Sequence, residues 1–112
     1  MNNKDYKLML EDFNELNKDE KEKLLTKLRN EIDSLDENLT KLLSKRTYFS
    51  VMIGRVKRAL KMPTYNPERE REISKRINKF AKKPLNTSAL NRIYERILDE
   101  SRAIQKDDIE EN

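Results

Sequence analysis

The 112-residue chain contains neither cysteine nor histidine. Without cysteine there is no disulfide framework and no thiolate chemistry, and without histidine the commonest general base and metal ligand are missing. No apolar run approaches the roughly 18 residues that a membrane span needs, and the N-terminus lacks the apolar core of a signal peptide. These absences predict a soluble protein, which we expect to be cytoplasmic.

Hydrophobic residues are scarce and charged residues abundant, at 35% and 41% of the chain, so one domain of this length could bury only a modest core. The net charge of +4 is unevenly distributed. Residues 1–22 carry a net charge of −3 and residues 107–112 a net charge of −4, which leaves +11 for residues 23–106. Such a body suits an anionic partner, either nucleic acid or a small polyanionic metabolite.

Glycine occurs once, at Gly54, and proline only at positions 63, 67 and 84. No run of β-branched residues alternates with polar ones, so strands are not expected. The pattern predicts an all-α fold of three helices. The first runs from about 18 to 61, after an Asn17/Glu20 capping box. The second begins at Asn66 and Pro67, and the third is capped by Asn86 or Thr87 and ends near Gln105.

The first helix carries an apolar seam with spacings of three and four residues, sustained over five heptads. Its positions are Leu25, Leu28, Ile32, Leu35, Leu39, Leu42, Arg46, Phe49, Ile53, Val56 and Leu60. A helix of this length spans about 65 Å, whereas a compact chain of this size is roughly 35 Å across. The seam therefore needs a second chain, and a symmetric dimer is the simplest solution.

Each predicted helix carries polar side chains on its apolar face: Arg46 in the first, Glu70 in the second, and Ser101 and Gln105 in the third. Each has an ordinary explanation. A seam arginine can set register, a carboxylate near a helix start compensates the helix dipole, polar groups near a helix end are commonly solvated, and Lys57 can reach solvent. These explanations do not account for all three helices together. Buried cations without carboxylate partners cost several kcal/mol each, which a bound dianion would offset.

Spacing along the first helix limits which cations can act together. Arg46 and Lys57 lie 11 residues apart, so they share a face about 16 Å apart and can grip a ligand about 8–10 Å across. Arg29 lies about 25 Å before Arg46 and cannot reach the same small molecule. In an antiparallel dimer, Arg29 of the partner can approach Arg46, which predicts two shared sites.

Four stretches together resemble the all-α chorismate mutases: LRNEIDSLDENLTKLLSKR, IGRVK, PTYNPERERE and ILDESRAIQ. The likeness runs from about Leu28 to Gln105, with one small length change near 82–85. It implies an intertwined antiparallel homodimer that isomerises chorismate to prephenate in aromatic amino-acid biosynthesis. A [3,3] rearrangement needs no nucleophile, metal or proton transfer, so it suits a chain without histidine or cysteine, and no cofactor is expected.

The resemblance also implies roles for single residues. Arg29 is similar to the arginine contributed by the partner chain and Arg46 to its same-chain counterpart, both binding substrate carboxylates. Lys57 resembles the lysine that contacts a carboxylate and the ether oxygen. Gln105 resembles the glutamine that donates to that oxygen.

Glu70 is similar to the carboxylate that binds the ring hydroxyl. Asn66 stands where many members have aspartate, which puts a side-chain role there in doubt and leaves a backbone N–H contact. The remaining positions implied by the resemblance are Arg69 beside Glu70, Ser101 near a carboxylate, and the apolar walls Ile53 and Leu98.

Three alternatives stay open. An isochorismate–pyruvate lyase shares this fold and clamp, although its branch tends to have an apolar residue at the position of Glu70. A catalytically silent regulatory domain of the same fold is another. A basic helical dimer that binds nucleic acid should carry its cations on an outer face, whereas here polar groups point inward.

We expect three parts along the chain. Residues 1–20 form an extension of unknown role with a weak helical stripe (Tyr6, Met9/Leu10, Phe13, Leu16). Residues 21–106 form the domain that resembles the mutases, and residues 107–112 form an acidic tail.

Overall fold

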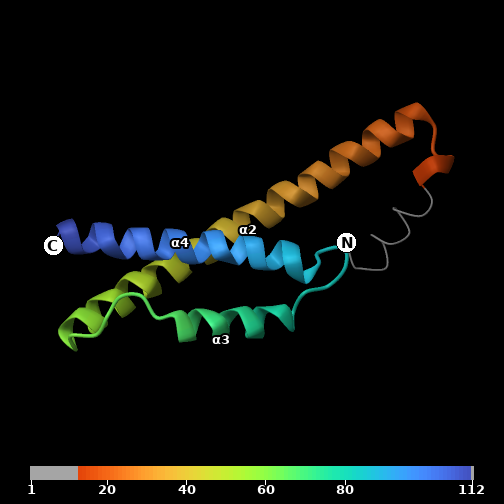
Figure 1. The fold of residues 1–112 in the computed structure, drawn as a ribbon. Helices are drawn as coiled ribbons and strands as arrows, with labels where there is room; N and C mark the ends of the chain where they lie inside the picture. Colours follow the sequence, from red (N-terminus) through yellow and green to blue (C-terminus); the bar gives the residue numbers. More distant parts are fainter. Residues whose placement is uncertain (1–12, 112) are drawn as a thin grey trace. The chain divides into compact units, whose positions relative to one another are not determined.

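The computed structural model describes residues 13–111, and these contain helices and no strand (Figure 1). The elements are a 3-10 turn η1 (Phe13–Glu15), a long helix α2 (Lys18–Ala59), α3 (Pro67–Asn78) and α4 (Thr87–Glu111). The predicted all-α fold with a very long first helix is confirmed. Of the weak stripe at the N-terminus, Tyr6 and Met9/Leu10 lie outside the described residues, and Phe13 lies in η1.

All three helices begin where side-chain caps predict. Asn17 and Glu20 form a reciprocal capping box, in which each side chain accepts the other's backbone N–H at 3.2 and 2.9 Å. Asn66 caps α3 by accepting an N–H three residues on at 3.1 Å. Asn86 does the same for α4 at 2.8 Å, which identifies Asn86 as the cap.

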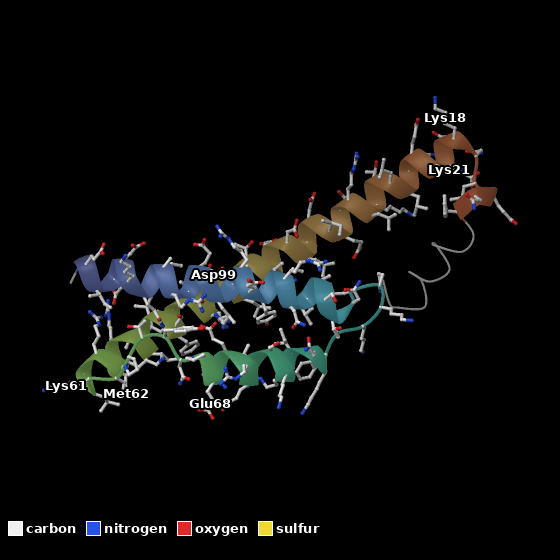
Figure 2. The ribbon with its side chains drawn as sticks, viewed as in Figure 1. Lys18, Lys21, Lys61, Met62, Glu68 and Asp99 are labelled. Carbon is white, nitrogen blue, oxygen red and sulfur yellow. The ribbon has the colours of Figure 1, made fainter. Side chains whose placement is uncertain are left out.

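The end of α2 differs slightly from the prediction. The helix ends at Ala59, two residues earlier than expected. Lys61 and Met62 lie in the turn that follows the helix (Figure 2). Lys61 adopts the left-handed conformation with a φ of 58°, and the Met62 N–H donates to the Lys57 carbonyl at 2.8 Å. The chain thus turns out of the helix before Pro63 requires it to.

The end of α4 corrects the predicted boundary near Gln105. The helix continues to Glu111, so the acidic residues 107, 108, 110 and 111 lie within it. The reason is tertiary: the carboxylate of Asp108 accepts hydrogen bonds from Arg55 and Arg58 of α2. This contact holds an additional turn and a half of helix in place.

The described chain divides into two compact units, residues up to 42 and residues 43–112. In the second unit, α3 packs on α4, and Ser74 of α3 donates to Asn91 of α4 at 3.2 Å. Its buried apolar residues are Ile73 and Ile77 of α3, each 8% exposed. The core is small, as the composition predicted.

The apolar seam of α2 is uncovered in the single chain. Of its ten apolar residues, Leu28 is half-buried and the other nine are exposed: Leu25, Ile32, Leu35, Leu39, Leu42, Phe49, Ile53, Val56 and Leu60. Exposed apolar rows on a protein surface, here on both sides of Arg46, are typical of interaction sites. No helix in residues 13–111 is long and apolar enough to cross a membrane.

Candidate functional site

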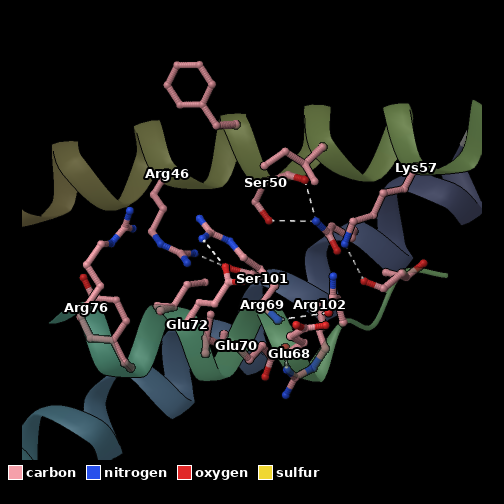
Figure 3. A pocket seen from close by; sticks show the side chains of 18 of the residues that line it. Arg46, Ser50, Lys57, Glu68, Arg69, Glu70, Glu72, Arg76, Ser101 and Arg102 are labelled. Atoms are coloured by element: carbon pink, nitrogen blue, oxygen red, sulfur yellow. Dashed lines mark hydrogen bonds and ion pairs between the residues drawn. The ribbon is translucent and has the colours of Figure 1, made fainter. Parts of the chain in front are cut away.

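A pocket of about 670 Å³ lies among the C-terminal part of α2, α3 and α4, within residues 43–112 (Figure 3). Its volume falls in the usual range for small-molecule sites. Nine of the ten site residues expected from the sequence line it: Arg46, Ile53, Lys57, Asn66, Arg69, Glu70, Leu98, Ser101 and Gln105. The tenth, Arg29, is not among the lining residues.

Two half-buried cations extend into the pocket from α2. Arg46 donates from Nη1 to the Ser101 hydroxyl at 2.8 Å, and that hydroxyl donates to the Ile97 carbonyl at 2.9 Å. Lys57 donates from Nζ to the Thr64 carbonyl at 3.1 Å. Within residues 13–111 neither cation has a carboxylate partner. Neutral acceptors therefore orient both charges and leave them uncompensated, which favours two anionic groups on a ligand.

Gln105 of α4 is buried against α2, with 8% of its surface exposed. Its Nε2 donates to the Ser50 carbonyl at 2.6 Å and to the Ser50 hydroxyl at 3.1 Å. A Cβ at Gly54 would lie only 3.2 Å from Gln105 Cγ, so the glycine lets the two helices approach closely. Sequence reasoning assigned no role to Ser50 or Gly54, although a single glycine inside a long helix signals such an approach.

On the opposite side of the pocket, Arg69 and Arg102 are already paired with carboxylates. Arg69 Nη1 lies 3.2 Å from a Glu72 carboxylate oxygen. Arg102 binds Glu70 through Nη1 and Asp99 through Nη2. The hydrogen bond to Glu70 is the main reason that the pKa of Arg102 is raised above its ordinary value. Arg102 has no assigned role in the sequence reasoning, although it follows Ser101 directly.

A second ion-pair cluster joins α2 and α4 one turn beyond Gln105. Asp108 accepts from Arg55 at 2.8 and 3.1 Å and from Arg58 at 3.0 Å, and its side chain is only 13% exposed. The hydrogen bond from Arg55 is the largest cause lowering the pKa of Asp108, with burial acting in the other direction. The cluster fixes the position of α4 next to the glutamine.

The chemistry available in this pocket is that of binding and polarisation. It offers uncompensated cations, a buried amide and a carboxylate, with the apolar walls Ile53 and Leu98. Within residues 13–111 no cluster of three or more aspartate or glutamate side chains could hold a metal ion. Such a site can hold a small dianion in one conformation and stabilise negative charge that grows on it.

Comparison with known proteins gives a consistent result. The profile of the family described as chorismate mutase type II matches residues 28–106. The chain is 30% identical over 88 residues to the chorismate mutase of Methanocaldococcus jannaschii, covering 78% of this chain and 89% of that protein. It is 35% identical over 86 residues to the bifunctional chorismate mutase/prephenate dehydratase of Aquifex aeolicus, covering 73% of this chain and 24% of that protein. This chain thus spans about a quarter of the bifunctional relative.

Among solved structures, the chain resembles the chorismate mutase from Helicobacter pylori in complex with prephenate. The TM-score is 0.75 at 38% sequence identity, over 80% of this chain and 98% of that chain. It also resembles a chorismate mutase from Thermus thermophilus with a TM-score of 0.71 at 26% identity, over 73% of this chain and 93% of that chain.

Proposed function

Because this chain belongs to the chorismate mutase type II family, we propose that it is an isomerase that converts chorismate to prephenate. The reaction takes place in the pocket of residues 43–112. The observation that carries this proposal is the arrangement of Arg46, Lys57 and Gln105, two uncompensated cations and a buried amide, around one small cavity. The solved Helicobacter pylori relative, which binds prephenate, supports the same product.

Arg46 and Lys57 select the reactive shape of the substrate. Chorismate is a dianion with two carboxylates, and the rearrangement requires the enolpyruvyl group to lie over the ring. Cations held by the Ser101 hydroxyl and the Thr64 carbonyl are fixed before substrate arrives. Binding both carboxylates therefore restricts the substrate to one conformer, which converts binding energy into rate.

Lys57 and Gln105 act on the bond that breaks. In the cyclic transition state the ether C–O bond breaks while a new C–C bond forms, and no atom enters or leaves. The ether oxygen gains negative charge as its bond lengthens. The Lys57 ammonium keeps N–H groups free beside its bond to Thr64, and the Gln105 amide can donate to this oxygen once one N–H exchanges its Ser50 acceptor for it. Both donors then stabilise the transition state more than the substrate, which lowers the barrier.

The Glu70 carboxylate accepts a hydrogen bond from the ring hydroxyl of chorismate and so fixes the ring end of the substrate. Its carboxylate lies on α3, across the pocket from Arg46 and Lys57 (Figure 3). The side chain of Asn66 is engaged in capping α3, so any contribution from this position comes from the backbone N–H groups at the start of the helix.

A second copy of this chain covers the exposed seam and completes the site. The nine exposed apolar residues of α2 are the face on which an antiparallel copy would pack. In that arrangement Arg29 of the second copy reaches the carboxylate bound by Arg46. The mutase domain proposed here is residues 21–106, which includes Gln105 of α4. Residues 1–20 have no role in this scheme.

The direct test is loss of chorismate absorbance on adding purified protein, with prephenate identified as product. Lys57→Met should abolish most activity, whereas Lys75→Met, at an exposed position of α3, should leave it unchanged. Absence of turnover in the folded wild-type protein would refute the mutase proposal and favour a regulatory domain. Release of pyruvate from isochorismate without chorismate turnover would favour the lyase.

A further inference from the structure

We propose that Arg102 is a positioning residue for the mutase reaction: it holds one oxygen of the Glu70 carboxylate so that the other faces the substrate hydroxyl. The inference rests on the proposed function and assigns a role to a residue outside the implied substrate contacts. Arg102 and Glu70 are 32 residues apart and come from different helices, so the contact is set by the packing of α3 on α4.

Arg102 is itself firmly held. One guanidinium nitrogen binds Glu70, another binds Asp99 one turn earlier on α4, and the guanidinium carbon lies 5.2 Å from the centre of the Tyr65 ring. A planar group with three anchors in different directions has little freedom to rotate. It can therefore fix the carboxylate that it contacts.

The two oxygens of Glu70 differ in a way that suits this role. Oε2 accepts from Arg102, while Oε1 accepts no hydrogen bond from any group in residues 13–111. An ionised carboxylate can accept several hydrogen bonds, so Oε1 keeps its capacity for the hydroxyl of a ligand. The side chain is 25% exposed and lies in the first turn of α3.

Without Arg102, two other positions compete for Glu70. The uncompensated Arg46 and Lys57 attract a carboxylate across the pocket. If the Glu70 side chain turned toward them, it would neutralise the cations that bind the substrate carboxylates. A second cavity of about 300 Å³ is lined by both Glu70 and Arg102, so the carboxylate can also turn away from the substrate. Arg102 prevents both movements by supplying the nearest cation.

The test is a double-mutant cycle measured by chorismate turnover. Arg102→Met removes the charge and keeps an unbranched apolar stem, and it should lower kcat/KM about 10- to 100-fold, or about 1.4–2.8 kcal/mol. The loss should fall mainly on KM, because the ring hydroxyl is bound in substrate and transition state alike. In a Glu70→Ala background the same substitution should add less than about twofold, since residues acting through one contact are not additive.

Arg96→Met is the matched control, because Arg96 lies on the same helix and pairs with Glu100 on the exposed surface. It should leave kcat/KM unchanged. Arg102→Lys keeps the charge but replaces the planar guanidinium fork by a compact ammonium, so it should reverse part of the increase in KM. If Arg102→Met does not fold, the cycle is run with Arg102→Lys, whose smaller loss should likewise vanish in the Glu70→Ala background.

Two results would overturn the inference. One is an equal loss from Arg102 substitution with and without Glu70, which would identify a purely structural role. The other is unchanged KM and kcat in a folded Arg102 variant. Both require an active wild-type enzyme, so they are distinct from a wild-type protein that does not turn over chorismate, which would refute the proposed function itself.

Discussion

Replacing Gly54 by alanine should separate the stability of this protein from its activity. Gly54 lies inside α2, where alanine is more favourable than glycine by about 0.8–1 kcal/mol. The added Cβ, however, would lie 3.2 Å from Cγ and 3.4 Å from Cδ of Gln105. The flexible end of Gln105 must then move away from α2 by a few tenths of an ångström.

The magnitudes indicate which effect dominates each measurement. The Gln105–Ser50 hydrogen bond is 2.6 Å long, so a small displacement keeps it within hydrogen-bonding range and costs little stability. We therefore expect the free energy of unfolding of Gly54→Ala to stay within about 1 kcal/mol of wild type. Catalysis is less tolerant: since a misplacement of about 1 Å can cost about 100-fold, a shift of a few tenths should lower kcat/KM by up to about 10-fold.

Thermal unfolding and chorismate turnover measure the two effects on the same samples. A Gln105→Ala background provides the control, because that truncation removes Cγ and Cδ, and Gly54→Ala should then stabilise by about 1 kcal/mol. An unchanged kcat/KM in Gly54→Ala would show that catalysis does not depend on the exact position of the Gln105 amide. Destabilisation by more than about 2 kcal/mol would show that the helices cannot adjust.

Three further predictions concern charge and assembly. Gln105→Glu should be active mainly in acid and lose rate toward neutral pH, because an ionised carboxylate repels both the ether oxygen and the Ser50 carbonyl that Gln105 binds. A wild-type pH profile would show that residue 105 does not contact the ether oxygen. Arg29→Ala and Lys57→Ala subunits, each poorly active alone, should regain part of the activity when mixed, since one site of the mixed dimer keeps both residues. No recovery after verified subunit exchange would disprove the shared site. Asp108→Asn should lower Tm at neutral pH. Because the folded-state pKa of Asp108 is lowered, its contribution is present above the ordinary value and is lost as pH falls through the folded-state pKa. The difference in Tm between Asp108→Asn and wild type should therefore shrink below about pH 4. A difference that stays constant with pH would show that the substitution acts through packing and not through charge.

Much of this architecture follows from local signals in the sequence. The three helix starts follow from Asn17, Asn66 and the pair Asn86/Thr87, because capping depends only on residues within one turn; the structure identifies Asn86 as the third cap. The inward polar residues predict a polar pocket because helical periodicity determines which side chains share a face. Their roles came from resemblance and stay proposals, including that of Arg29.

What the sequence did not reveal depends on residues far apart in the chain. An acidic run is unfavourable at a helix C-terminus, so ending the third helix near Gln105 was reasonable on local grounds. The structure continues it because Asp108 meets Arg55, 53 residues earlier. The Arg102–Glu70 contact was missed for the same reason: no local pattern pairs residues on two different helices.

The Asp108 cluster has a consequence for where the functional segment of this chain ends. The family profile stops at residue 106, before the acid that fastens α4 to α2. A polypeptide trimmed to that limit would retain every side chain proposed to touch the substrate and lose the anchor that follows Gln105. The profile match therefore includes every residue proposed to contact the substrate, while the contact that holds the end of α4 on α2 lies outside it.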